Sequence, residues 1–180
     1  DVGCGLDHES AQNLASALGR MHNSLKHLSV DNTDIGDEGI TDIVTALRLH
    51  PQLESLQLCD NNIGRDGCIA LGNTLRRWPR SNKLETLDID DNAIDDSALQ
   101  ALVEGMMNCR SLEKLYLNGN ESITAAGLRS LFPLLQSSSH SLLTLGLGRI
   151  AFGDEGAMVL AEVLRGNKSL KELWLSPKAS

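Results

Sequence analysis

A short leucine pattern recurs along the whole chain at nearly constant spacing. Six segments have the form L-x-x-L-x-[LIV], and their first leucines are Leu25, Leu53, Leu84, Leu112, Leu142 and Leu170. Successive segments begin 28, 31, 28, 30 and 28 residues apart. Self-similarity at such a period is typical of a solenoid, in which each unit buries its apolar face only by stacking on its neighbours. The repeat therefore constrains the fold more than any other feature of the sequence.

Each unit combines two kinds of apolar periodicity. The alternation in L-x-L predicts a short strand, and leucines or isoleucines about four residues apart then predict a helix. In the second unit the turn and helix positions are Asn61, Ile63, Gly67, Leu71 and Leu75. Because strand and helix alternate, successive strands are expected to lie parallel, with the helices on the opposite side. Helices need roughly 8–10 Å each and strands only about 4.8 Å, so the stack should curve with its strands on the concave side.

The chain of 180 residues is expected to form one domain of repeats. Five units are complete and one at each end is partial. Their ranges are 1–24 (partial), 25–52, 53–83, 84–111, 112–141, 142–169 and 170–180 (partial). The last range has a strand pattern without a helix, which leaves an open edge. The sequence therefore predicts a segment of a longer array, or self-association through that edge.

This pattern resembles the leucine-rich repeat family, and the match is best at residues 53–71, which fit L-x-x-L-x-L-x-x-N-x-[IL]-x-x-x-G-x-x-x-L. The period near 28 residues is similar to that of the ribonuclease-inhibitor-like subclass. The resemblance implies a segment of a curved, right-handed α/β horseshoe. It also implies that Asn61, Asn92 and Asn120 form a buried ladder whose side chains bond to the backbone of the turns. Thr33 and Ile150 depart from the pattern, and an isoleucine cannot make such bonds, so the ladder should break in the fifth unit.

Composition excludes several classes of function. The chain has 32 leucines and only five aromatic residues, and its formal net charge is −8. An acidic chain argues against a track for nucleic-acid phosphates or a basic membrane-binding surface, and no apolar run reaches the roughly 20 residues that span a bilayer. The four cysteines fit no zinc or disulfide pattern and indicate small buried residues in a reducing compartment, the cytoplasm or the nucleus. No catalytic, cofactor or metal motif is found, so neither enzymatic activity nor a cofactor is expected.

The residues expected on the concave face differ between the two halves of the array. The first three units offer seven acids and one base, whereas the later units offer three bases and two acids. Tyr116 and Trp174 fall in one strand column on either side of Gly146, which predicts a gap that a partner side chain could enter. An acidic part would steer a basic partner and an aromatic part would anchor it. The candidate partner-binding residues are Asp60, Asp88, Asp90, Tyr116, Arg149 and Trp174.

Other interpretations of these residues stay open. A charged concave face can simply be solvated, and Trp174 can cover the end of the array. A calcium site around residues 88–91 is disfavoured because adjacent strand residues point to opposite faces. Four basic residues surround Trp78, as in some nucleic-acid contacts, but packing of Trp78 over a helix end is the preferred interpretation. The four are Arg76, Arg77, Arg80 and Lys83.

We therefore expect a non-catalytic protein–protein interaction module that binds a protein partner on its concave face, such as the recognition segment of a sensor, an inhibitor or a scaffold. The resemblance implies settings that include ribonuclease inhibition, intracellular immune receptors and activation of the Ran GTPase. A GTPase-activating protein of the Ran-activating type is the alternative, although no residue matches a signature motif of that group.

Overall fold

The strands form a single parallel sheet. The computed structural model describes residues 5–21, 25–137 and 142–175, and within them six strands follow one another in chain order, β1-β2-β3-β4-β5-β6. They are His27–Ser29 (β1), Ser55–Gln57 (β2), Thr86–Asp88 (β3), Lys114–Tyr116 (β4), Thr144–Gly146 (β5) and Glu172–Trp174 (β6). Every neighbouring pair is parallel and in the same register. The predicted α/β leucine-rich-repeat solenoid is confirmed.

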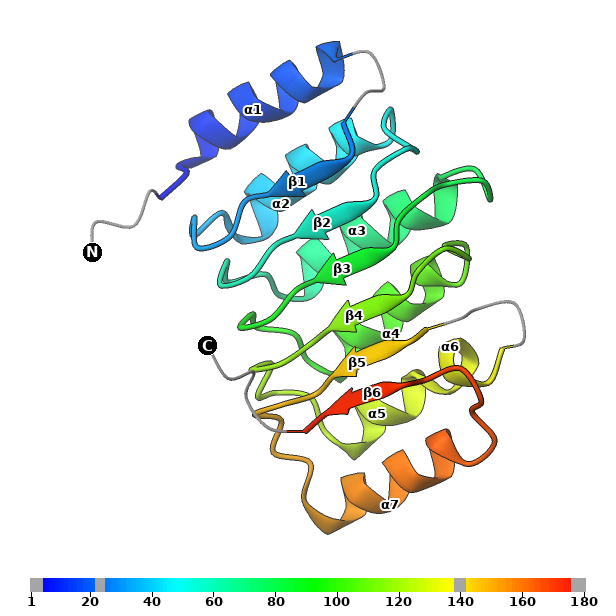
Figure 1. The fold of residues 1–180 in the computed structure, drawn as a ribbon. Coiled ribbons are helices and arrows are strands. Elements are labelled where there is room, and N and C mark those ends of the chain that lie inside the picture. The colour runs from blue at the N-terminus through cyan, green and yellow to red at the C-terminus, as the bar shows by residue number, and fades with distance from the viewer. Residues whose placement is uncertain (1–4, 22–24, 138–141, 176–180) are drawn as a thin grey trace.

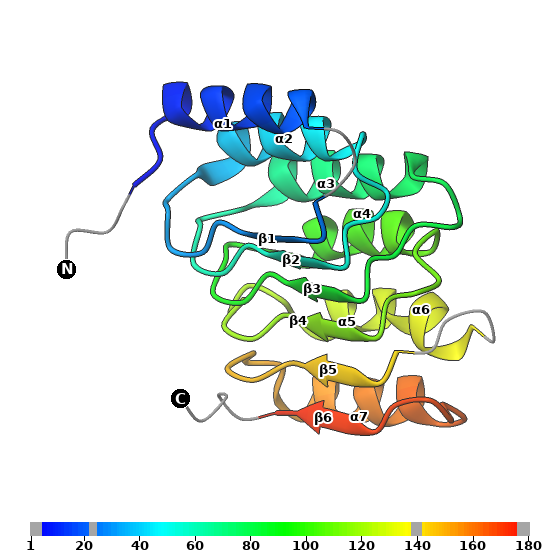
Figure 2. The ribbon, with the colours of Figure 1, turned by 45° about the horizontal axis from the view of Figure 1, so that its top comes forward.

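Helices cover one side of this sheet (Figure 1). They are α1 (His8–Arg20), α2 (Gly36–Leu47), α3 (Arg65–Arg77), α4 (Asp96–Met106), α5 (Ala125–Ser130), α6 (Phe132–Gln136) and α7 (Gly153–Leu164). Figure 2 shows the two layers, with the turns that join them at either end of the strands. We call the sheet face that lies away from the helices the concave face.

The core lies between the two layers and is built from the repeated leucines. Leu56, Leu87, Leu115 and Leu145 occupy the middle of their strands and are completely buried. Burying one such side chain stabilises the fold by about 2 kcal/mol. Leu28 is only half-buried because it lies in the first strand of the sheet. The core is therefore a product of stacking, as the repeat predicted.

The repeated glycine of α3 is a packing requirement. A Cβ at Gly67 would lie 2.7 Å from the side chain of Ile40 in the preceding helix, which is closer than carbon atoms can approach. The unit from residue 112 differs from the single helix expected there, because its helical part is split into α5 and α6 with Pro133 in the first turn of α6. A proline cannot donate the backbone hydrogen bond that a continuous helix needs.

The loops that lead from helix to strand are closed by buried polar side chains. The Trp78 indole donates to the Leu47 carbonyl at 3.0 Å, and Trp78 is 3% exposed. His50 lies 2.9 Å from the Leu18 carbonyl in the same way. Both carbonyls belong to the last turn of a helix, where no intrahelical partner exists. The preferred interpretation of Trp78, packing over a helix end, is confirmed.

None of the helices in the described ranges combines the length and the apolar run that a membrane span requires.

Candidate protein-binding face

Buried asparagines hold the turns that follow the strands. The side-chain oxygen of Asn92 accepts hydrogen bonds from the N–H groups of Asn61 (3.2 Å) and Ile63 (2.9 Å). Its amide group donates to the Leu58 carbonyl of the preceding unit at 2.9 Å. Asn61 repeats this pattern one unit earlier, where it accepts from the N–H groups of Thr33 and Ile35 and donates to the Val30 carbonyl. The side chains thus join each turn to the one before it, as the resemblance implied.

The ladder ends where the sequence predicted. Asn120 still accepts from the Ile94 N–H at 3.2 Å, but Ile150 occupies the next position and has no polar side-chain atom. The turn of the fourth unit closes instead through its own backbone, with the Ile123 N–H donating to the Asn120 carbonyl at 3.1 Å. The prediction that the ladder breaks in the fifth unit is confirmed.

A second series of hydrogen bonds runs along the concave face, where each strand ends. Asp31 accepts from the Cys59 N–H at 2.8 Å, Asp90 from the Asn118 N–H at 2.6 Å, and Asn118 from the Gly148 N–H at 2.6 Å. Each of these three acceptors therefore bonds to the backbone of the following unit. We call these residues, Asp31, Cys59, Asp90, Asn118 and Gly148, the concave ladder.

Cys59 changes the pattern of the concave ladder. Its thiol donates to Asp88 at 3.0 Å, and the same carboxylate oxygen accepts from the Asp90 N–H at 3.2 Å. Burial, followed by the nearby carboxylates with Asp88 first among them, raises the pKa of the Cys59 thiol. The thiol therefore stays protonated and serves as a donor that fixes Asp88.

Asp90 is the most perturbed carboxylate of the concave face. Burial raises its pKa to about 6, and the negative charges of Asp88 and Asp91 act in the same direction. Hydrogen bonds from Asn118 oppose the shift, because they stabilise the ionised form. The negative charge of this part of the face therefore changes between pH 5 and 7.

The residue after each concave-ladder position adopts a left-handed backbone. These φ angles are 54° at Asn32, 53° at Asp60, 54° at Asp91, 73° at Gly119 and 59° at Arg149. This conformation lets the Arg149 guanidinium reach back over the intervening unit and pair with the Asp91 carboxylate. A Cβ at Gly119 would overlap that carboxylate and lie 2.6 Å from the guanidinium. We call the Asp91–Arg149 pair the clasp.

The aromatic column is formed as predicted, but the predicted gap is closed. The last positions of β3 to β6 are aligned as Asp88, Tyr116, Gly146 and Trp174. The rings of Tyr116 and Trp174 meet in an edge-to-face arrangement, with centroids 6.4 Å apart and planes at 79°. A Cβ at Gly146 would lie 2.7 Å from the Asn118 amide. The expectation that a partner side chain enters a gap at Gly146 is therefore wrong, because the two rings and Asn118 fill it.

The structure gathers most of the candidate residues into one region. Asp88 and Asp90 are joined through a hydrogen bond, and Asp88 lies beside Tyr116 in the register. Arg149 is linked to this region through Asp91. Asp60 is exposed in the preceding unit, and its backbone N–H donates to the Asp90 carbonyl at 3.0 Å.

Three further residues organise the site and were not among the chosen candidates: Asn118, Asp91 and Glu172. Asn118 follows its strand at the same position as Asp90, so the repeat register could have identified it. The pairing of Asp91 with Arg149 could not have been found in this way, because it joins residues 58 positions apart and skips a unit. Glu172 shares the concave face with Trp174, and its carboxylate accepts from the Thr144 hydroxyl at 3.2 Å.

Opposite charges also meet at the other end of the sheet. Lys26 donates to Glu54 at 2.8 Å, and this bond lowers the pKa of Glu54 and raises that of Lys26. Part of the acidity predicted for the first units is therefore balanced within the face. Asp88 and Asp90, in contrast, accept hydrogen bonds from neutral donors, the Cys59 thiol and the Asn118 N–H.

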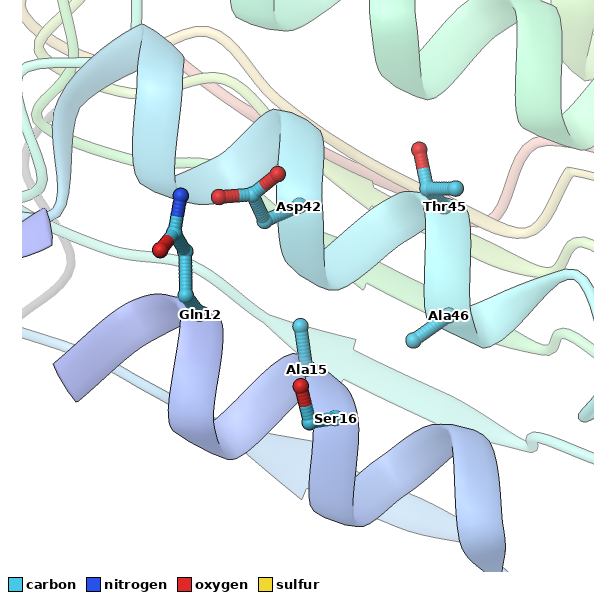
Figure 3. Close-up of a pocket in the computed structure, with 6 residues that line it drawn as sticks. All are labelled: Gln12, Ala15, Ser16, Asp42, Thr45 and Ala46. Atoms are coloured by element: carbon cyan, nitrogen blue, oxygen red, sulfur yellow. The ribbon is translucent and has the colours of Figure 1, made fainter. Parts of the chain in front are cut away.

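Two cavities lie between helices. A hollow of about 390 Å³ between α1 and α2 is lined by small and polar side chains (Figure 3). These are Gln12, Ala15, Ser16, Asp42, Thr45 and Ala46. A more apolar hollow of about 450 Å³ separates α4 from α5 and α6, and Met107 and Phe132 line it. Within the described ranges, no cluster of three or more His, Cys, Asp or Glu side chains could hold a metal ion.

Comparison with known proteins agrees with the architecture. A family model described as Leucine Rich repeat matches residues 22–44, 50–72, 80–103 and 108–132, which together exceed half of the chain. The chain belongs to the leucine-rich repeat family. Its relatives place it in the ribonuclease-inhibitor-like part of that family.

Two curated relatives illustrate the sequence similarity. The Ribonuclease inhibitor of Sus scrofa is 31% identical over 173 residues, which cover 96% of this chain and 37% of that protein. NACHT, LRR and PYD domains-containing protein 3 of Mus musculus is 32% identical over 165 residues, which cover 91% of this chain and 16% of that protein. The chain thus spans about a third or less of the length of these relatives.

Two solved structures share the fold of this leucine-rich repeat chain. One is entitled Leiomodin-1 Actin-Binding Site 2, with a TM-score of 0.68 and 17% identity, covering 86% of this chain and 87% of that one. The other is the tropomodulin C-terminal domain of Caenorhabditis elegans, with a TM-score of 0.66 and 19% identity, covering 89% and 93%. At this level of identity the likeness concerns the fold alone.

Proposed function

We propose that this leucine-rich repeat chain is a non-catalytic recognition module whose concave face binds a protein partner. The observation that carries the proposal is the contrast between the two faces of the sheet. The inward-facing leucines only build the core, whereas the concave positions change from unit to unit and include Asp88, Tyr116 and Trp174. Function in a repeat scaffold depends on such variable positions.

The geometry of the concave face suits protein binding. The concave ladder and the clasp hold polar side chains in place before any partner arrives. A preorganised surface loses less conformational entropy on association. The Tyr116–Trp174 pair adds aromatic side chains of the kind that contribute most to binding energy at protein interfaces.

Names of similar proteins support a binding role. One solved structure with this fold is entitled an actin-binding site, and one relative is named an inhibitor of ribonuclease. These names describe those proteins. We further propose that the module works in a reducing compartment, the cytoplasm, which the free thiols of Cys59, Cys68 and Cys109 support.

Two matched glutamine substitutions test the location of the binding face. Gln57 is exposed in β2 on the concave side, and Gln100 is exposed in α4 on the helix side. Gln57→Arg and Gln100→Arg make the same change of size and charge on opposite faces. A partner captured by the wild-type chain should be lost with Gln57→Arg and retained with Gln100→Arg, measured by affinity capture followed by binding of the purified partner.

The opposite result would move the binding site to the helices. Failure of any protein to bind the wild-type chain specifically would contradict the recognition function itself. Circular dichroism and thermal unfolding of both variants control for folding, since exposed substitutions change stability by less than about 0.5 kcal/mol. Acceleration of GTP hydrolysis by a small GTPase would contradict the non-catalytic part of the proposal.

A further inference from the structure

The Tyr116–Trp174 pair lies on the concave face rather than in the core. Both residues are half-buried, on β4 and β6, and the strand between them contributes only Gly146 at this position. Their edge-to-face contact bridges that strand. The pair therefore presents aromatic surface to the solvent side of the sheet, where it can meet a partner.

Carboxylates flank this pair. Asp88 is the register neighbour of Tyr116 on β3, and Glu172 lies two residues before Trp174, on the same face of β6. Burial raises the pKa of the Tyr116 phenol, and the negative charges of Asp88, Glu172 and Asp90 raise it further, in that order. The carboxylates therefore act on the same small region. We call Asp88, Tyr116, Glu172 and Trp174 the aromatic–carboxylate patch.

Hydrogen bonds fix both flanking carboxylates. One oxygen of Asp88 accepts from the Cys59 thiol and from the Asp90 N–H. One oxygen of Glu172 accepts from the Thr144 hydroxyl. Each bond orients a carboxylate without adding a positive charge, so the negative charge beside the rings is not neutralised by them. Such an arrangement favours a cation over any neutral or anionic group.

We infer that the aromatic–carboxylate patch binds an arginine side chain of the protein partner. A guanidinium is planar and stacks on aromatic rings while its N–H groups donate to carboxylates, which combines both features of the patch. A lysine ammonium offers only a compact charge and should bind less well. This inference rests on the proposed concave binding face and specifies the chemistry of its partner.

A lysine of the chain itself, Lys114, lies near the aromatic–carboxylate patch. Lys114 is exposed two residues before Tyr116 on the same face of β4. Its positive charge opposes the approach of a second cation. Lys114→Gln should therefore strengthen binding of an arginine peptide about twofold to threefold.

The test is a titration of the 15N-labelled chain with three capped tripeptides, acetyl-Gly-Arg-Gly-amide and its lysine and citrulline counterparts. The chain has two tryptophans, and the buried indole of Trp78 is an internal reference for that of Trp174. The arginine peptide should shift the Trp174 indole signal and the amides of β4 to β6. Binding of the lysine peptide should be weaker by about threefold, and that of the uncharged citrulline peptide by about tenfold or more.

Matched variants decide whether the patch is responsible. Asp88→Asn keeps the oxygen that accepts from Cys59 and Asp90 but removes the charge, and should weaken arginine binding at least threefold. Asp66→Asn makes the same change at an exposed position on α3 and should leave it unchanged. Equal binding of arginine and citrulline, equal effects of the two variants, or shifts confined to the helices would each overturn the inference.

The outcomes separate this inference from the function on which it rests. If Gln57→Arg abolishes partner capture but the peptides do not distinguish arginine from citrulline, the concave face binds protein and the arginine site is wrong. If the arginine peptide binds the patch but Gln57→Arg leaves capture intact, the arginine site stands and the proposed location of the partner is wrong.

Discussion

The three units in residues 25–111 and the units from residue 112 onward hydrogen-bond the backbone of their turns in different ways. In the first group the N–H groups of Ile35, Ile63 and Ile94 all donate to an asparagine side chain of the next unit. From the fourth unit onward this role passes to the local backbone, as at Ile123, because Ile150 offers no acceptor. The backbone N–H groups of this turn can thus donate either to a side chain of the next unit or to a carbonyl of their own turn.

This difference in turn closure changes which side-chain bonds connect successive units. In the first group the buried ladder couples each turn to the next. Asn120 carries this coupling across the junction to the fourth unit. Between the fourth and fifth units the buried ladder is absent, whereas the concave ladder continues from Asn118 to Gly148 and the clasp joins Asp91 to Arg149. The side-chain bonds that tie the turn of the fifth unit to earlier units therefore lie on the face that we propose binds the partner.

The largest effect is expected inside the buried ladder. Asn92→Ala removes five hydrogen bonds and leaves buried backbone groups without partners. We expect a loss of about 3–5 kcal/mol in the free energy of unfolding, measured by urea denaturation.

Thr33→Ala at the first ladder position is the matched control. Thr33 contributes one bond to the Val30 carbonyl and one to Asn61, and it is only half-buried. A cost of about 1 kcal/mol is expected. Equal losses for the two variants would show that the ladder does not distinguish the interior units from the first one.

A second prediction concerns the glycine under the clasp. Gly119 and Gly153 both have a left-handed backbone, with φ of 73° and 56°. A Cβ at Gly119 would also meet Asp91 and Arg149, whereas nothing lies within 4 Å of one at Gly153. Gly153→Ala should cost about 1 kcal/mol through backbone strain, and Gly119→Ala about 2–3 kcal/mol. Thermal unfolding of both variants measures the difference. Similar costs would mean that the side chains of Asp91 and Arg149 move aside from the new Cβ without loss of stability.

The fold was predictable because the same repeated leucines determine the strands, the core and the register between units. The same leucines that set the strand pattern fill the core, and the register of Leu56, Leu87 and Leu115 follows from their spacing. The break of the ladder was predictable as well, since it depends on the side chain of Ile150 alone. One helix per unit was not correct for residues 125–136, where Pro133 divides the helix.

The details of the concave face were less predictable. Column positions follow from the register, so the alignment of Tyr116 with Trp174 was correct. The rotamers that bring the two rings together over Gly146 do not follow from it. Likewise, the pKa of Asp90 depends on how deeply Asn118 and the neighbouring carboxylates enclose it, which is a property of packing rather than of spacing.

The third prediction uses Asp90 at the junction of the two groups. Its pKa is raised from 3.8 to about 6, so the folded state binds a proton more tightly than the unfolded state. This contribution to stability is complete below about pH 4 and is lost as the pH rises through 6. Because Asp90 is partly exposed, we expect only about 1 kcal/mol between pH 5 and 7 after solvent screening.

Asp90→Asn isolates that contribution. Urea denaturation at pH 5 and pH 7 should show that the wild type loses more stability than the variant as the pH rises, since other groups titrate in both. A carboxyl 13C titration should place the midpoint of Asp90 near 6 and lower it in Asp88→Asn, where a like charge is removed. A midpoint near 4 in the wild type would mean that Asp90 is well solvated.

The smallest effect is expected for the clasp itself. The side chains of Asp91 and Arg149 are 44% and 45% exposed, so solvent screens their attraction and the coupling should be about 0.5 kcal/mol. A double-mutant cycle with Asp91→Asn and Arg149→Gln measures it, because backbone strain at each position cancels in the cycle. The coupling should fall in 0.5 M salt. A coupling above about 2 kcal/mol would mean that the later units depend on the clasp for their attachment, and a partner that breaks it would then loosen the junction between the two groups of units.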